Sequence, residues 1–273
     1  MIRKGIKQLL SIPLLGMLIF LGCRILTPEK PEETIKEEEE VYESISLYVS
    51  LGDIENALLA FEEARAKDPE GPATRVLYAG LLLAAGRISE AEETLESVLT
   101  DAPNNTDALY SLSLIAGLKD DTSGKKELLT KILQENPIHS NALASIGEIY
   151  LAEKNYGKAK DSFKQALSGD ERNLVARIGL GNVYLREKDG TAAEEEFSLA
   201  IEIAPQYSFS YSDRSRARIM NNDPIGALED LSKAISLDPD FYWYYIDRGK
   251  LLLAVFAEEE AAKNDYDRAI GLD

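Results

Sequence analysis

Prolines recur along this chain at intervals of 34 residues. Five of the six positions on this grid hold proline and one holds glutamate: Pro69, Pro103, Pro137, Glu171, Pro205 and Pro239. Proline ends one helix and presets the start of the next, because it lacks a backbone N–H and fixes φ. A fixed period of this length indicates a repeat protein, in which each unit packs on its neighbours. The period therefore restricts the chain to a stack of similar units.

Each period also carries a helix face at a fixed distance before the grid position. Alanine stands twelve residues before it at Ala57, Ala91, Ala159, Ala193 and Ala227. An apolar residue follows four positions later, at Phe61, Leu95, Phe163, Phe197 and Leu231. Three positions further on are Ala64, Val98, Ala166, Ala200 and Ala234. This spacing defines one face of a helix, and the small residues allow a neighbouring helix to approach closely.

A first helix and a turn precede this second helix in each period. The segments Ile146-Gly147-x-x-Tyr150 and Leu180-Gly181-x-x-Tyr184 repeat one layout. Turn-forming residues separate the two helices at Gly52-Asp53, Gly86-Arg87 and Asn222-Asp223-Pro224. The pattern predicts an all-α chain of helix-turn-helix units.

These residues resemble the tetratricopeptide repeat family, whose pattern is W-x2-L-G-x2-Y, A-x3-F and P. The resemblance implies a right-handed superhelical solenoid of about seven units, which we place at 38–71, 72–105, 106–139, 140–173, 174–207, 208–241 and 242–273. The third unit is degenerate because Lys125 replaces the small residue, although Leu129, Ile132 and Pro137 keep the register. The seventh unit has one extra residue in its turn, which shifts Ala262, Tyr266 and Ala269 by one position.

The family resemblance also implies a concave groove lined by the first helices. Mapping the family's groove positions onto this chain gives six candidate partner-binding residues: Asn182, Arg186, Phe209, Arg216, Trp243 and Lys250. Arginine suits planar carboxylates, and asparagine can hold the backbone of an extended peptide. The family's carboxylate clamp is matched only loosely. The charges therefore form either a ligand site or a solvated face that balances neighbouring acids.

Four other charged residues are predicted to be structural. Arg214 and Arg248 occupy a position that normally holds leucine, and Asp230 and Asp265 lie on the facing second helices. By the resemblance, these form Arg–Asp ion pairs in place of apolar packing, since a buried charge requires such a partner.

An aromatic run, Phe241-Tyr242-Trp243-Tyr244-Tyr245, opens the seventh unit. Five consecutive side chains on one helix cannot all face a core. Tyr245 is at a packing position, whereas Tyr242 and Trp243 either contact a partner or pack on the sixth unit.

The N-terminus reads as a targeting segment. Arg3, Lys4 and Lys7 precede an apolar run of 14 residues at 9–22, which is short for a membrane-spanning helix and typical of a signal peptide. Phe20-Leu21-Gly22-Cys23 resembles the lipobox of bacterial lipoproteins, although Phe20 stands where leucine is favoured. We therefore expect a signal peptide at 1–22, a lipidated Cys23 and a tether at 23–37; an uncleaved signal anchor is the alternative.

Composition argues against several classes of function. A formal charge of -18 disfavours nucleic acid as a partner. The chain has one histidine, His139 in a predicted turn, and one cysteine, so neither a metal site nor a cofactor is expected. No phosphate-binding loop or nucleophile motif occurs, and the prediction is that the protein is not an enzyme.

The sequence thus predicts a lipid-anchored scaffold of a bacterial envelope, periplasm-facing or surface-exposed, that binds a protein or peptide partner. Two alternatives remain open at this stage. One is an accessory role in periplasmic uptake of a small organic acid. The other is self-assembly, with a homo-oligomer formed through a final helix that no capping helix covers.

Overall fold

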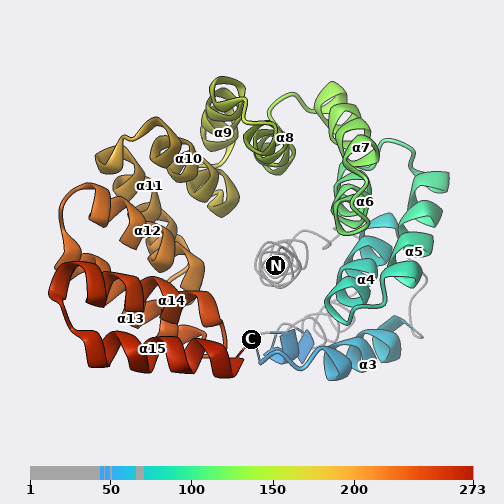
Figure 1. The fold of residues 1–273 in the computed structure, drawn as a ribbon. Coiled ribbons are helices and arrows are strands. Elements are labelled where there is room, and N and C mark those ends of the chain that lie inside the picture. Colours follow the sequence, from blue (N-terminus) through green and yellow to red (C-terminus); the bar gives the residue numbers. More distant parts are fainter. Residues whose placement is uncertain (1–43, 46, 50, 66–70, 273) are drawn as a thin grey trace. The chain divides into compact units, whose positions relative to one another are not determined.

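The computed structural model describes residues 44–45, 47–49, 51–65 and 71–272, and every regular element among them is a helix (Figure 1). The described helices comprise α3 (Ile54–Arg65) and six consecutive pairs: α4 (Pro72–Ala84) with α5 (Ile88–Asp101), α6 (Thr106–Leu118) with α7 (Thr122–Glu135), α8 (Ser140–Ala152) with α9 (Tyr156–Gly169), α10 (Leu174–Glu187) with α11 (Gly190–Ile203), α12 (Ser208–Met220) with α13 (Pro224–Leu237), and α14 (Tyr242–Leu251) with α15 (Glu259–Leu272). The predicted all-α class is confirmed. The predicted signal peptide, Cys23 and the tether lie outside the described residues.

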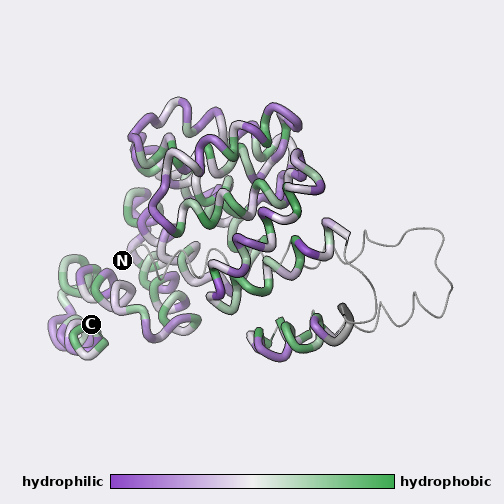
Figure 2. Tube along the Cα trace, turned by 90° about the vertical axis from the view of Figure 1, so that its right-hand side faces the viewer, coloured by the Kyte–Doolittle hydropathy of each residue, from purple (hydrophilic) through white to green (hydrophobic). Residues whose placement is uncertain are grey.

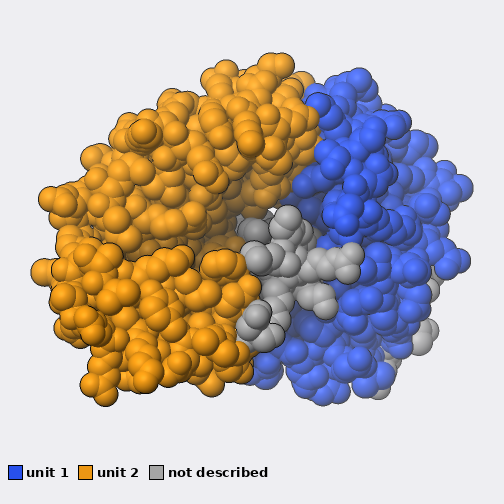
Figure 3. Space-filling view, viewed as in Figure 1, with its two compact units in different colours: residues 1–135 blue, residues 136–273 orange. Residues whose placement is uncertain are grey.

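The chain divides into two compact units, residues 1–135 and 136–273 (Figure 3). Within each unit, the two helices of a pair pack on each other, and the second helix also packs on the first helix of the next pair. Apolar and polar residues alternate along these helices (Figure 2), as expected where one helix face is buried and the other meets solvent. None of the described helices is both long and apolar enough to cross a membrane.

The turn inside each pair uses one left-handed residue at a constant place. The residues with positive φ are spaced by 34 positions: Gly52, Gly86, Asp120, Lys154, Lys188 and Asn222. A left-handed residue ends the first helix by turning the backbone away from the helical path. The side chain of the next residue then caps the second helix in most pairs. Asp121, Asn155, Asp189 and Asp223 each accept a hydrogen bond from the backbone N–H three positions later.

The last pair departs from this turn. Its first helix ends in a single π-helical segment, η1 (Leu252–Phe256), and the left-handed residue is Ala257, one position later than the period requires. The extra residue predicted for the turn is thus taken up by the wider i→i+5 winding at the end of the first helix.

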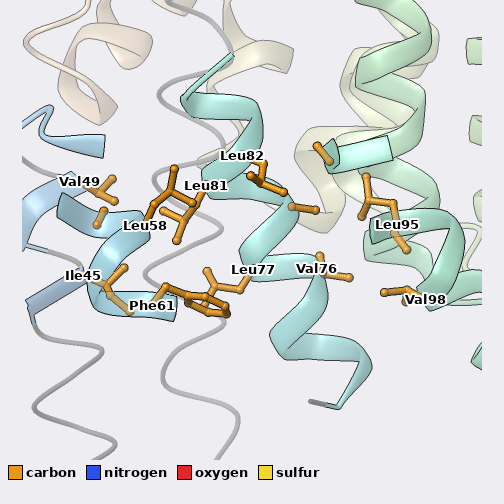
Figure 4. Packing of buried hydrophobic residues seen from close by; sticks show 14 of the residues in the cluster. Ile45, Val49, Leu58, Phe61, Val76, Leu77, Leu81, Leu82, Leu95 and Val98 are labelled. Carbon is orange, nitrogen blue, oxygen red and sulfur yellow. The ribbon is translucent and has the colours of Figure 1, made fainter. Parts of the chain in front are cut away.

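The core of the first unit is aliphatic. Figure 4 shows Leu77, Leu81 and Leu82 of α4 among side chains from the elements on either side, with Phe61 of α3 and Leu95 of α5. Leu81, Leu82 and Leu95 have no exposed surface. Burying a side chain of this size contributes about 1.5–3 kcal/mol, so such a cluster is a main source of stability of this unit.

Close approach in the second unit depends on glycine. A Cβ added at Gly147 would lie 2.6 Å from the Phe163 ring, and one at Gly181 would lie 2.7 Å from the Phe197 ring. Both aromatic rings are fully buried. The glycines of the first helices therefore make room for the aromatic residues of the second helices, which explains the pairing of these two sequence signals.

The degenerate third unit keeps its register through its apolar residues. Leu129 and Ile132 of α7 are fully buried. Lys125 is half-buried, and its Cδ lies 3.5 Å from the place of a Cβ on Gly117. The aliphatic stem of the lysine thus occupies the space beside Gly117, in keeping with the way long cationic side chains bury their stems.

Candidate functional site

The predicted structural arginines both meet their aspartates in the second unit. Arg214 donates from Nε to Asp230 Oδ2 (2.9 Å) and from Nη2 to Asp230 Oδ1 (2.7 Å). Arg248 repeats this two-point contact on Asp265 at 2.8 and 2.7 Å. Both aspartates are buried. The hydrogen bond that each arginine donates to its aspartate raises the pKa of that arginine, so the guanidinium groups stay charged inside the stack.

Each of these arginines also reaches the preceding pair of helices. Arg214 Nη1 donates to Ser198 Oγ of α11, and Arg248 Nη1 donates to Ser232 Oγ of α13, both at 3.2 Å. One guanidinium thus joins the second helices of two successive pairs. The serines were not singled out from the sequence, although their spacing of 34 residues is the signal that links them.

A second arginine on α12 extends this network. Arg218 donates from Nε to Glu194 Oε1 (3.0 Å) and from Nη1 to the carbonyl oxygen of Gly226 (2.9 Å), and Nη1 lies 3.1 Å from Asp230 Oδ2. Asp230 therefore balances two guanidinium groups. The polar groups at this junction satisfy one another, which is the condition for burying charge.

The candidate groove surface carries both charges, because two of its predicted cations pair with aspartates. Arg216 pairs with Asp213, and Lys250 Nζ donates to Asp247 Oδ1 at 3.2 Å, in both cases within one turn of the same helix. Both cations remain well exposed, with half or more of each side chain in solvent. Asp213 is the main cause of the raised pKa of Arg216, and Asp247 adds to it. Arg186 at the end of α10 is exposed.

The remaining candidates are partly buried. Asn182 donates from Nδ2 to the carbonyl oxygen of Ile178 on its own helix (3.1 Å). Phe209 packs edge-on against Phe241 and Tyr244, with ring centroids 5.0 and 5.7 Å apart. Trp243 stacks at a tilt on Tyr242, and Lys250 Nζ lies 6.0 Å from its ring centroid. The structure thus brings Lys250 and Trp243 together, whereas Phe209 belongs to a separate aromatic cluster.

The buried aromatic residues explain the rest of the run. Tyr244 is almost fully buried and its hydroxyl lies 2.9 Å from Ser208 Oγ, while Tyr245 donates to the carbonyl oxygen of Pro239 at 3.0 Å. Phe241 stands at the start of α14, where its side chain makes no capping hydrogen bond and packs on Tyr244 instead. Phe241, Tyr242 and Trp243 are half-buried, so these three members of the run reach the surface.

A short motif that sequence reasoning missed unites these contacts. Tyr211-Ser-Asp-Arg-Ser-Arg216 and Tyr245-Ile-Asp-Arg-Gly-Lys250 share the pattern Tyr-x-Asp-Arg-x-Arg/Lys at a spacing of 34. In each copy the tyrosine donates to a proline carbonyl oxygen, the first cation enters the stack, and the aspartate pairs with the outer cation. The outer aspartates, Asp213 and Asp247, could have been found by aligning the two units.

His139 has a structural place in the turn before α8. Its Nδ1 accepts a hydrogen bond from the backbone N–H of Ala142 (3.2 Å), which caps the helix. Asn105 and Asn173 do the same for α6 and α10, one period before and after. Among the described residues no group of three or more His, Cys, Asp or Glu side chains is arranged to hold a metal ion.

Comparisons with known proteins agree with this geometry. A family model described as tetratricopeptide repeat matches residues 48–115 and 150–213. The solved structure of a tetratricopeptide repeat protein from Parabacteroides merdae superposes with a TM-score of 0.56 at 24% identity and covers 86% of this chain and 92% of its own. The Cut9–Hcn1 hetero-tetramer of the APC/C gives a TM-score of 0.73 at 14% identity over 85% of this chain and 46% of the other.

A curated protein also matches in part. The cellulose synthase operon protein C of Pseudomonas fluorescens is 37% identical over 65 residues, which is 24% of this chain but only 5% of that protein. The chain thus spans only a small fraction of this relative's length. Together, the helix pairs, the glycine–aromatic contacts and these matches show an all-α fold of the tetratricopeptide repeat type.

Proposed function

We propose that this protein is a non-catalytic scaffold that binds a segment of a partner protein on the first helices of the second unit, α10, α12 and α14. The observation that carries the proposal is the mixed surface formed by Arg186, Arg216, Lys250 and Trp243. These side chains stand at the positions that line the family's groove, and the repeat stack holds their helices in place. Arg186 and Arg216 are exposed and Trp243 is half-buried, and arginine and tryptophan side chains are common anchors of protein interfaces.

The ion pairs on this surface bear on the kind of ligand. Arg216 and Lys250 already have carboxylate partners on their own helices. A small organic acid would have to displace those partners with few other contacts to offset the loss. A protein segment engages several points at once, including the aromatic ring of Trp243. The geometry therefore favours a protein partner over the organic-acid alternative.

We further propose that Cys23 is lipidated and holds the scaffold at a bacterial envelope membrane, facing the periplasm or the outside. The support is the sequence alone: a positive start, a short apolar run and a lone cysteine where cleavage would occur. The test is metabolic labelling of the full chain with an alkyne fatty acid, beside Cys23→Ser. Label on the parent alone is the expected result, and equal label or none on both would refute lipidation.

The binding surface is tested by cross-linking and capture from envelope extracts. The full chain is compared with Arg186→Glu/Arg216→Glu/Lys250→Glu. A matched control reverses the same number of charges on exposed lysines of the second helices, Lys164→Glu/Lys233→Glu/Lys263→Glu. We expect the same protein to be captured by the parent and the control and lost from the first variant. Capture by all three would show that these cations form a solvated face.

A further inference from the structure

An apolar strip is exposed on the second unit where α12 turns into α13 and α14 turns into α15. It consists of large aliphatic side chains that are about half or more exposed: Ile219 (47%), Met220 (43%), Ile225 (65%), Leu253 (47%) and Val255 (52%). We call these five residues the turn edge. Isolated exposed aliphatic residues are ordinary on protein surfaces, whereas a group of them on adjoining turns marks a site of interaction.

The repeat itself does not require an apolar residue at the positions of Ile225 and Val255. The position of Ile225 holds Ser89, Ser123, Gly157 and Thr191 in the four preceding units. The position of Val255 holds Lys119, Glu153, Glu187 and Asn221. Equivalent turns therefore fold with polar or small residues at these two positions, and the aliphatic side chains of Ile225 and Val255 call for a reason other than folding. The position of Ile219 and Leu253, by contrast, is leucine in most units.

The two turns adjoin each other. A Cβ on Gly190, the first residue of α11, would meet Met220 Cγ at 3.1 Å and Asn221 Oδ1 at 2.3 Å, so the turn of one pair packs on the turn before it. The period places Ala254 and Val255 in the same relation to Pro224, which is next to Ile225. Phe256 of η1 packs on the cluster of Ala227, Leu231 and Leu251, so this segment lies against the start of α13. The five side chains thus form one strip across two pairs.

The charge at the border of the turn edge is negative. Glu258, Glu259 and Glu260 follow Val255 directly, are all exposed, and form no ion pair with a described residue. Asp223 is also exposed beside Ile225. Arg218 of α12, the cation next to Ile219, is matched by Glu194, Asp223 and Asp230. With a chain charge of -18, both the local and the long-range field attract a cation.

We propose that the turn edge binds an amphipathic helix of a partner protein whose apolar face is bordered by lysine or arginine. Packed helices lie about 8–10 Å apart, and residues i and i+7 of a docked helix are about 10 Å apart, so one such helix spans both turns. The π-helical segment η1 presents Leu253 and Val255 at this edge, and segments of this kind are frequent at functional sites. This surface is separate from the cationic residues of the proposed function.

The test uses a defined probe, a fluorescent model helix of about 15 residues with leucine at i, i+3, i+4 and i+7 and lysine elsewhere. A second peptide replaces every lysine by glutamate. In anisotropy titrations with the full chain, we expect binding of the lysine peptide alone. Ile225→Ser/Val255→Asn, which installs residues that equivalent turns already hold, should weaken it at least about tenfold. Ile270→Ser, which removes an aliphatic residue that is 75% exposed on α15, is the matched control and should not.

A further variant tests the contribution of the three glutamates beside the turn edge to peptide binding. Glu258→Gln/Glu259→Gln/Glu260→Gln should weaken the lysine peptide and flatten the loss of affinity between about 0.05 and 0.5 M salt. The variant Arg186→Glu/Arg216→Glu/Lys250→Glu should bind the peptide at least as well as the parent, which separates this site from the proposed function. Circular dichroism confirms that each variant keeps its helices.

Three results would overturn the proposal. Equal affinity of the parent and Ile225→Ser/Val255→Asn would remove the turn edge as the site. Self-association of the parent that this variant abolishes, without peptide binding, would assign the strip to a second copy of the chain. Sedimentation of the parent, but not the variant, with phosphatidylglycerol vesicles, again without peptide binding, would assign it to a lipid surface.

Discussion

Helices α4 and α12 hold the same place in the 34-residue period, four units apart, but they pack by different chemistry. In α4, Tyr78 and Leu82 belong to an apolar cluster in which Leu82 is fully buried (Figure 4). In α12 the same two positions hold Arg214 and Arg218, which converge on the buried Asp230. Both helices nevertheless have 13 residues and pack on their own second helix and on those of their neighbours.

The comparison separates what the fold requires from what it tolerates. Both helices keep a left-handed residue after the first helix and an alanine on the second helix, at Gly86 and Ala91 in one pair and Asn222 and Ala227 in the other. Even the contact with the preceding pair persists, since the Tyr78 hydroxyl donates to Glu62 (3.0 Å) where Arg214 donates to Ser198. The left-handed turn residue and the alanine of the second helix define the repeat, whereas the other packing positions accept either apolar or charged side chains.

The largest effect is expected from breaking the ionic junction. Asp230→Ala removes the buried carboxylate that Arg214 and Arg218 share and leaves their guanidinium groups without it. Removal of one partner of a buried pair costs about 3–5 kcal/mol, because the remaining charge stays desolvated. Urea unfolding with amide exchange on α12 and α13 measures the loss. A cost below about 1 kcal/mol would show that solvent reaches the junction.

The apolar counterpart is Leu82→Ala in α4. Truncation of a fully buried leucine costs about 2–5 kcal/mol through lost burial and the cavity left behind. Unlike the ionic junction, this loss should not depend on salt, which urea unfolding at low and at about 1 M NaCl would show. Equal salt dependence of the two variants would contradict the distinction between the two regions.

Alkaline pH should also separate the regions. Burial raises the pKa of Tyr207 well above its ordinary value of 10, so the folded state keeps the neutral phenol. The contribution of the buried phenol to the free energy of unfolding is present below about pH 10. It is lost as pH rises further, because there the unfolded chain releases the phenolic proton and the folded chain does not. Tyr207→Phe, in the second unit, should reduce the drop in unfolding midpoint between about pH 9 and 11. An unchanged drop would refute a buried phenol.

The smallest effect concerns a turn shared by both regions. Lys188 adopts the left-handed conformation (φ 64°) that glycine holds at Gly86. Lys188→Gly removes the steric strain of the side chain, partly offset by the greater chain entropy of glycine, so we expect a net stabilisation of up to about 1 kcal/mol. Thermal unfolding measures this change in stability. Destabilisation would mean that a contact of the lysine side chain stabilises the fold by more than the left-handed backbone costs.

Some features could be read from residues alone because they depend on local spacing. The helix pairs follow from the proline grid and the alanine series, and the pairing of Arg214 with Asp230 follows from the family resemblance. The serine acceptors were missed because their role depends on distances between helices. Asp213 and Asp247 were missed although they lie within one turn of Arg216 and Lys250 on the same helices, where an alignment of the two units would have found them. Likewise, the left-handed conformation of Lys154 and Lys188 has no sequence signal, since lysine does not favour it.

The sequence by itself determined that this chain forms repeated helical hairpins, because periodic small and turn residues act within a few positions of one another. Only the tertiary structure decided how the charges are shared. It showed that Asp230 serves two arginines, that Arg216 and Lys250 are already paired, and that the extra residue of the last pair becomes a π-helical segment with Leu253 and Val255 exposed. The sharing of Asp230 depends on how α12 packs on α13, and the spacing of residues along either helix does not encode that distance.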